Sequence, residues 1–309
     1  MTLLNNKNTI ILVLIFMAVY SKSNAQNIPD GEGSVLWKIK HPKTDKISYL
    51  LGSVHTYGSK WIESYKVIDS LVSKQDIFLC ENTFSIDSLK KNNFTRFTFE
   101  AKADRNLFED DLELIRTHFL KTTDIDVGEL LDSAKKSDSF IYSIYYILLY
   151  QLAEKNNLKV SPDFVPMDDI LLQKAFKEEK KCYGLDNMQT LNKVLSAKKN
   201  IKSLKRTIVD LVKDLELIEL PPERKREFAK YISMMNYYNK GKFIFDSHSI
   251  SDDGVKAVTR NKSWMNVLPA FIMDKNCFIT VGIIHLNGKK GILQLLENQG
   301  FEISEVELK

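Results

Sequence analysis

The sequence contains few cysteines, with only three among 309 residues. Cys80, Cys182 and Cys277 form no Cys-x-x-Cys pair, which excludes the usual thiolate zinc and dithiol redox motifs. An odd number of cysteines at such wide spacing does not make a disulfide framework either. Because each one lies in or beside a strand-like segment, we expect three buried free thiols.

Several common catalytic signatures are also missing. The chain has no Gly-x-Ser-x-Gly elbow, no His-Glu-x-x-His motif, no Walker loop and no Gly-x-Gly-x-x-Gly turn. These absences argue against a serine α/β-hydrolase, a zincin, a P-loop nucleotidase and a Rossmann dinucleotide-binding protein.

A strong charge of either sign is absent as well. The formal net charge is +4, and the first 25 residues contribute Lys7 and Lys22 but no acid, so the rest of the chain carries +2. Basic residues are scattered among acidic ones. Composition therefore gives no electrostatic reason to expect nucleic-acid binding, and we predict none.

The chain has no apolar run long enough for a comfortable membrane span. The N-terminal run, from Thr9 to Tyr20, follows Lys7 and precedes Ser23-Asn24-Ala25, a sequence of small residues at which a signal peptidase would cleave before Gln26. We therefore predict that residues 1–25 are a signal peptide and that 26–309 form an exported protein, periplasmic or secreted, from a bacterium. No stable membrane span is expected after cleavage.

Two segments far apart in the chain share one design. Residues 47–55 form an apolar run that reaches Gly52 and then His55, and residues 278–285 repeat this arrangement with Gly282 and His285. Each is followed by an amphipathic stretch and a second strand. Both therefore read as β-Gly-x-x-His-α-β units.

These units predict an α/β fold with a mixed, largely parallel sheet. Its strands come from the N- and C-terminal portions, and a large helical insertion at about 86–250 separates them. We expect single helices at about 60–72 and 255–273, a buried apolar helix over 140–153, and a short strand over 181–186 inside the insertion.

The two histidines are candidate metal ligands. Groups at the carboxyl ends of neighbouring parallel strands meet in one crevice, so His55 and His285 are expected to lie together, with Glu81 at the end of its own strand. Imidazoles and a carboxylate suit Mn²⁺, Co²⁺, Fe²⁺ or Zn²⁺. Spacing leaves Glu81 open as third ligand or general base. Ser53, beside His55, is expected to hydrogen-bond the turn rather than to act as a nucleophile.

Taken together, these segments resemble the TraB/GumN family, which includes the TIKI metalloproteases. The resemblance covers nearly the whole mature chain and depends on the order and spacing of the motifs. The matching segments are Leu50–His55 (with Ser53 where the family more often has threonine), Glu81, Met167-Asp168, Gly184–Gln189 (with Asp186 where the family usually has glutamate), Arg260-Asn261 and Val281–Leu286.

The resemblance implies an α/β fold related to erythromycin-esterase-like and haem-binding ChaN-like proteins, with the paired histidines in a shared site. For the TIKI branch it implies a divalent-metal-dependent peptidase. Its Arg-Asn signature gives functional weight to Arg260, as a stabiliser of an oxyanion, and to Asn261, which would orient a ligand or the substrate carbonyl. Asp168 is either an acid supporting the site from outside the ligand shell or the N-cap of the following helix.

Two functions of different classes follow. The leading one is a metal-dependent hydrolase, most concretely a peptidase, in which a metal-activated water attacks an amide of a peptide or small-molecule substrate. The alternative is a non-enzymatic protein that holds haem, iron or another small ligand in the same crevice. The tyrosine-rich helix at 140–153 would suit an apolar cofactor in that case.

Overall fold

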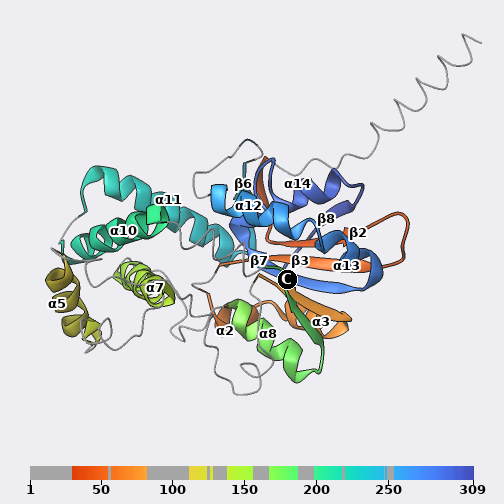
Figure 1. Ribbon diagram of the computed structural model, residues 1–309, viewed down its shortest axis with the longest axis horizontal. Coiled ribbons are helices and arrows are strands. Elements are labelled where there is room, and N and C mark those ends of the chain that lie inside the picture. The colour runs from red at the N-terminus through yellow and green to blue at the C-terminus, as the bar shows by residue number, and fades with distance from the viewer. Residues whose placement is uncertain are drawn as a thin grey trace, which may run out of the picture.

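The chain folds around a six-stranded sheet with helices on both sides (Figure 1). The computed structural model describes residues 30–54, 57–81, 111–123, 126–127, 138–155, 167–186, 198–217, 220–246, 248 and 254–309. His55 and Thr56 fall outside these ranges, as does the predicted signal peptide.

The sheet has the strand order β5-β4-β7-β3-β2-β8. Its strands are β2 (Leu36–Lys40), β3 (Ile47–Ser53), β4 (Ile77–Cys80), β5 (Lys181–Gly184), β7 (Cys277–Gly282) and β8 (Glu302–Val306). The pairs β5–β4, β4–β7 and β7–β3 are parallel, whereas β2 is antiparallel to both β3 and β8. This confirms the predicted α/β class, and four adjacent strands bring their carboxyl ends to one edge of the sheet.

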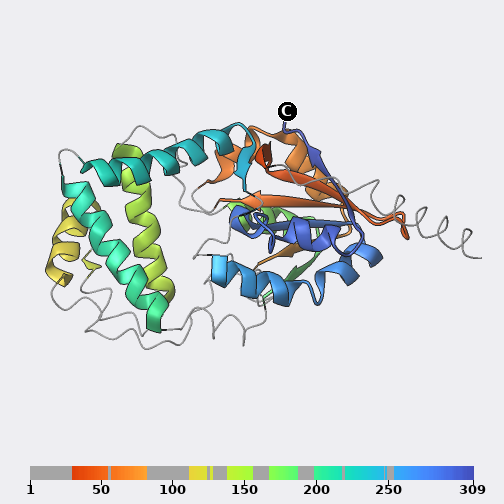
Figure 2. The ribbon, with the colours of Figure 1, turned by 90° about the horizontal axis from the view of Figure 1, so that it is seen from above.

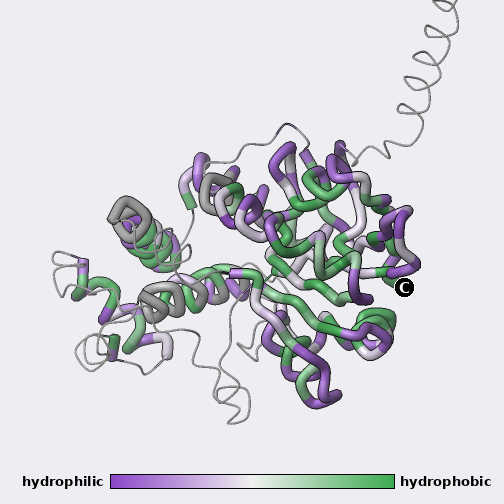
Figure 3. The backbone as a smooth tube through the Cα atoms, turned by 45° about the vertical axis from the view of Figure 1, so that its right-hand side comes forward, coloured by the Kyte–Doolittle hydropathy of each residue, from purple (hydrophilic) through white to green (hydrophobic). Residues whose placement is uncertain are grey.

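The central strands β4 and β7 are buried along their whole length because both faces are covered. Every residue of β4 and β7 is buried, as expected for parallel strands between two helical layers. In the β3–β7 register, Ser53 lies opposite Gly282. The two glycines of the Gly-x-x-His segments, Gly52 and Gly282, therefore lie on neighbouring strands at the same edge of the sheet, offset by one residue in the register. In Figure 3, hydrophobic segments run through the middle of the part of the molecule that contains the six-stranded sheet, with hydrophilic segments toward its periphery.

Helices cover the sheet from both sides (Figure 1). One side carries α2 (Ser59–Glu63), α3 (Lys66–Lys74) and α8 (Met167–Lys177); the other carries α12 (Gly254–Trp264), α13 (Leu268–Asp274) and α14 (Ile292–Glu297).

The two helices predicted as continuous, at 60–72 and 255–273, are each divided. Tyr65 leaves the helical conformation (φ −128°, ψ 77°), and its hydroxyl donates to the carbonyl of Asn239 at 2.6 Å. Val267 (φ −124°) interrupts the second helix just before a proline in the first turn of α13, and a proline cannot supply the N–H that a continuous helix would need there.

Three further helices form a second apolar cluster beside the sheet. They are α5 (Leu112–Thr123), α7 (Asp138–Lys155) and α10 (Lys198–Glu216), and Figure 2 shows them at one end of the molecule, with α11 (Pro222–Asn239) running back toward the sheet. A two-stranded ribbon follows, in which β6 (Lys242–Phe245) pairs with β1 (Gly31–Ser34). The expected insertion therefore also supplies a strand of the main sheet, β5, and one of this ribbon.

Two further expectations concern the apolar helix and the cysteines. The helix predicted at 140–153 is α7, and its buried Ile144, Leu148 and Leu152 belong to the cluster with α5 and α10. No helix of the described residues is long and apolar enough to cross a membrane. All three cysteines are free thiols; two are fully buried, and the third, Cys182, is partly buried.

Candidate functional site

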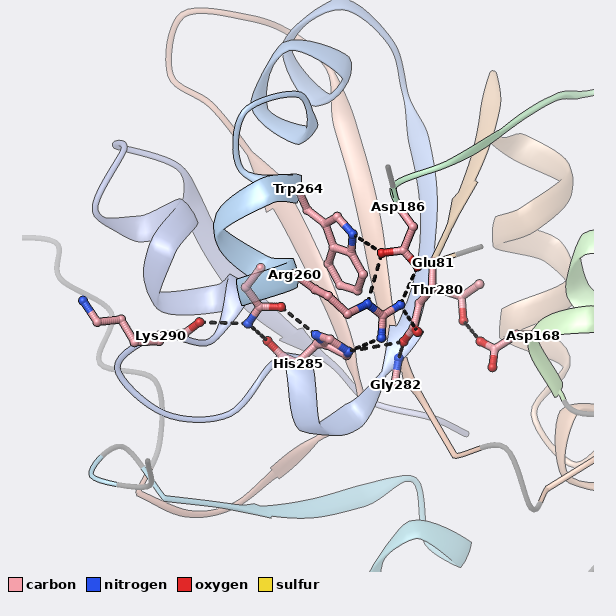
Figure 4. Close-up of polar contacts among 10 residues, drawn as sticks. Glu81, Asp168, Asp186, Arg260, Trp264, Thr280, Gly282, His285 and Lys290 are labelled. Atoms are coloured by element: carbon pink, nitrogen blue, oxygen red, sulfur yellow. Dashed lines mark hydrogen bonds and ion pairs between the residues drawn. The ribbon is translucent and has the colours of Figure 1, made fainter. Parts of the chain in front are cut away.

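Polar side chains collect where the four parallel strands end (Figure 4). Glu81 follows β4 directly, and Asp186 follows β5 by two residues. Beyond Gly282, the 3₁₀ turn η2 (Ile283–His285) delivers His285. Helix α12 adds Arg260, Asn261 and Trp264 from the covering layer. Except for His55, which lies outside the described residues, the structure brings the predicted principal site residues together.

Asn261 fixes the orientation and the tautomer of His285. The Asn261 amide nitrogen donates to the carbonyls of His285 (3.0 Å) and Lys290 (2.8 Å), so both of its hydrogens are used. Its oxygen faces His285 Nδ1 at 2.6 Å and must accept from it. Neutral His285 therefore carries its proton on Nδ1, and the lone pair on Nε2 faces the site. The imidazole also packs on Trp264, with 4.4 Å between ring centroids.

Glu81 is held by the backbone of β7 and by a cation. Gly282 N donates to Glu81 Oε1 at 2.5 Å, and Arg260 Nη2 donates to Oε2 at 2.6 Å. His285 Nε2 lies 3.6 Å from Oε1. A Cβ at position 282 would approach Oε1 to 3.1 Å, so glycine is the residue that lets the carboxylate lie directly against the strand end.

Arg260 lies at the centre of this network. Besides Glu81, its guanidinium contacts Asp186 through Nε (3.0 Å) and Nη2 (2.7 Å), and Nη1 lies 3.1 Å from His285 Nε2. Its Cζ lies 4.7 Å from the ring centroid of Trp264. Burial alone would lower the pKa of Arg260, but the two carboxylates outweigh it and raise that pKa, so the side chain stays charged.

Asp186 was not among the site residues predicted from the sequence. Its side chain is only 2% exposed, and Trp264 Nε1 donates to its Oδ1 at 2.8 Å. Burial raises the pKa of this carboxyl, and the hydrogen bonds from Arg260 and Trp264 oppose that rise. Two signals were available: Asp186 closes a short predicted strand, as Glu81 closes its own, and it lies in the segment Gly184–Gln189 that matches the family, at the position where the family usually has glutamate.

Gly52 and Ser53 lie on the neighbouring strand, β3. A Cβ on Gly52 would come within 2.2 Å of Ile283 Cδ1, so this glycine allows β3 to pack closely against the turn that carries His285. Ser53 is 1% exposed, and its hydroxyl has no hydrogen-bond partner among the described residues. The expected bond from Ser53 to the turn is therefore not seen in the part of the chain that the structure describes.

Asp168 lies inside the first turn of α8, which begins at Met167. Thr280 Oγ1 donates to Asp168 Oδ1 at 2.6 Å. The carboxylate thus ties α8 to β7, the strand that ends at Gly282, whereas an N-cap would precede the helix. This contact favours a supporting position behind the site.

The donor set suits a divalent ion. Two ligands at about 2.1 Å from one ion lie roughly 3.4 Å apart at a tetrahedral angle, which is close to the 3.6 Å between His285 Nε2 and Glu81 Oε1. The Asn261 contact holds Nε2 in the unprotonated form that a ligand needs. Arg260 Nη1 now shares that lone pair and would have to release it. The described residues thus provide two suitable donors, and His55 is the predicted third.

Comparison with known proteins supports the resemblance found in the sequence. The sequence profile of the TraB/PrgY/gumN family matches residues 35–305, nearly the whole chain. No curated protein and no solved structure shows a significant match.

Proposed function

The chain belongs to the TraB/PrgY/gumN family, and from this premise we propose that it is a metal-dependent hydrolase, most concretely a peptidase. The observation that carries this proposal is the geometry of His285 and Glu81. A histidine with its tautomer set by a buried asparagine presents its lone pair 3.6 Å from a carboxylate oxygen, at the carboxyl ends of adjacent parallel strands.

In this proposal His285 Nε2, Glu81 and His55 hold one divalent ion, Mn²⁺, Co²⁺, Fe²⁺ or Zn²⁺. Such an ion supplies a bound water whose pKa is lowered toward neutrality and polarises a carbonyl. Glu81 acts as a ligand rather than as the general base, because Oε1, which also accepts from Gly282 N, lies 3.6 Å from Nε2.

The other side chains have distinct tasks. Asn261 orients His285, and because both of its amide hydrogens are used by carbonyls, it does not orient the substrate. Arg260 Nη1, once released from Nε2, provides a permanent positive charge for the oxygen of the substrate carbonyl as negative charge develops on it. Burial of the network, with His285 3% and Glu81 10% exposed, strengthens these interactions by excluding water.

The test is hydrolysis of a fluorogenic peptide library by the protein starting at Gln26. We expect turnover that a chelator abolishes and that one of Mn²⁺, Co²⁺, Fe²⁺ or Zn²⁺ restores. His55→Ala and His285→Ala should each lose at least about 100-fold in turnover. His248→Ala is the matched control, since this histidine is 75% exposed and its replacement is expected to leave turnover unchanged. Full activity in both site variants would overturn the metal-water mechanism.

The ligand-binding alternative predicts a different result. A haem binder would show a Soret band on haem titration without any turnover. The tyrosine-rich helix that made this alternative attractive is α7, whose buried side chains belong to the α5–α10 cluster rather than to the sheet core. Among the side chains of α7 that the structure describes, the buried ones thus line the cluster with α5 and α10 and not the strand ends.

We further propose that the protein works outside the cytoplasm, in the bacterial periplasm or in the medium, after removal of residues 1–25. The charged, apolar and small-residue pattern of that segment supports this proposal.

A further inference from the structure

The guanidinium of Arg260 is shared between two carboxylates. Asp186 binds it through Nε and Nη2, at 3.0 and 2.7 Å, while Glu81 receives one bond from Nη2 at 2.6 Å. The two-point contact with Asp186 fixes both the position and the plane of the guanidinium. The single contact with Glu81 leaves Oε1 of that carboxylate facing His285.

Asp186 is itself rigidly held. Its backbone N–H donates to the carbonyl of Glu81 at 2.9 Å, which places it beside the end of β4. Its Oδ1 accepts from Trp264 as well as from Arg260, and these two residues lie four positions apart on one face of α12. One buried carboxylate thereby fastens both side chains of α12 to the strand ends.

The charges show what this arrangement does for a cation. With His285 neutral, two carboxylates against one guanidinium leave a single negative charge in the site. Without the charge of Asp186, Arg260 and Glu81 would form a neutral pair, and the guanidinium would compete for the Glu81 carboxylate with any divalent ion. Asp186 thus offsets the charge of Arg260 that would otherwise oppose metal binding.

We propose that Asp186 is the positioning residue of this site: it holds Arg260 beside the Glu81–His285 pair through Nε and Nη2 and offsets its charge, so that the contact of Nη1 with His285 Nε2 can give way to a divalent cation. The cation part of this inference rests on the proposed function. The positioning of Arg260 does not, since it concerns hydrogen bonds between side chains of the protein itself.

The first test is a double-mutant cycle on Mn²⁺ affinity. We expect Asp186→Asn to weaken binding about 10-fold or more, and Asp186→Glu, which restores the residue usual in the family, to recover most of it. In an Arg260→Gln background, the same Asp186→Asn change should cost at least about threefold less, because the competing guanidinium is gone. An equal loss in both backgrounds would mean that Asp186 acts only as a nearby charge, and would overturn the proposal.

The second test needs no metal and separates the two proposals. The Arg260 Nε–H and Trp264 Nε1–H signals in ¹H–¹⁵N spectra, assigned with Arg260→Gln and Trp264→Phe, should both shift in Asp186→Asn and return toward their original positions in Asp186→Glu. Asp214→Asn is the matched control: it removes a buried carboxylate from another arginine, Arg224 (Nε at 2.8 Å), and should leave both signals in place.

The outcomes are distinct. If the parent protein binds no divalent ion but both signals respond as expected, the proposed function fails and the positioning of Arg260 stands. If the signals are indifferent to Asp186→Asn in a folded protein, the positioning role is wrong whatever the metal result. Thermal unfolding of each variant identifies any that fail to fold. If Asp186→Asn does not fold, the positioning role is tested on Asp186→Glu, in which the Arg260 Nε–H and Trp264 Nε1–H signals should lie close to those of the parent protein.

Discussion

Replacement of Asn261 by alanine should destabilise the protein as well as the site. Asn261 is 2% exposed and makes three side-chain hydrogen bonds, to His285 Nδ1 and to the carbonyls of His285 and Lys290. At about 1 kcal/mol for each bond, the expected loss is roughly 3 kcal/mol in the free energy of unfolding. The buried imidazole N–H and the two carbonyls would be left without this partner.

Asn261→Asp separates the two tasks of the side chain. A carboxylate still accepts from His285 Nδ1 but turns a second oxygen toward the two carbonyls, replacing both donor bonds by repulsion. We therefore expect this variant to lose on the order of 2 kcal/mol or more while keeping the Nδ1–H tautomer of His285. If Asn261→Asp is as stable as the parent protein, the bonds to the two carbonyls contribute nothing to the free energy of unfolding.

The assay is urea unfolding of the metal-free protein, followed by tryptophan fluorescence and by circular dichroism. Asn266→Ala is the control, because Asn266 is an exposed residue just beyond the end of α12, and should change the free energy of unfolding by no more than about 0.5 kcal/mol. If Asn261→Ala falls within the same range, the proposed hydrogen-bond network around His285 is wrong.

Three further predictions follow from single features. Gly282→Ala, whose Cβ would lie 3.1 Å from Glu81 Oε1, should weaken Mn²⁺ binding by about 10-fold in a titration, with little effect on unfolding because the backbone there (φ −52°) accepts alanine. Burial raises the pKa of the Cys277 thiol to about 12 and of Cys182 to about 11, so iodoacetamide at pH 8 should label neither in the native protein and both in urea, as read by mass spectrometry. In a bacterial host that exports the protein, the intact mass should correspond to a chain starting at Gln26, and a chain that retains residues 1–25 would contradict cleavage.

The parts of the fold that repeat a simple pattern could be predicted from the sequence. Two apolar strands, each ending in Gly-x-x-His, indicated parallel neighbours, and the structure pairs β3 with β7 in that way. Glu81 was identified because it ends an unmistakable buried strand. The period of the apolar residues and the positions of the strand ends suffice to predict such features, because parallel strands bring their carboxyl ends to one edge of the sheet.

Features that depend on tertiary contacts were not predictable. The helix expected at 60–72 is divided at Tyr65, which contacts a segment 174 residues away, whereas the division of the helix expected at 255–273 had a local signal in the proline of α13. Strand β5 was predicted, but its pairing with β4 places it in the main sheet despite its position in the helical insertion. Local periodicity contains no information on either point.

For the site residues, too, the sequence indicated some features, and others required the structure. Arg260 and Asn261 drew attention only through the family resemblance, and nothing in their spacing distinguishes an exposed helix face from a site. Their tasks follow from partners far along the chain: Asn261 from His285, and Arg260 from Glu81 and Asp186. Such pairings require the three-dimensional structure.

The most direct test of the central claim is the metal content of the purified protein starting at Gln26, after reloading with Mn²⁺, Co²⁺, Fe²⁺ or Zn²⁺ and dialysis. We predict about one equivalent of one of these ions in the parent, loss of that ion in His285→Ala and in Glu81→Gln, and retention in His248→Ala. The last variant removes a histidine from an exposed group with Asp30 and Asp246, whose potential ligand atoms lie within 4.8 Å of one another. An ion that survives His285→Ala but is lost in His248→Ala would contradict the account, because the metal would then lie on the surface and not at the strand ends.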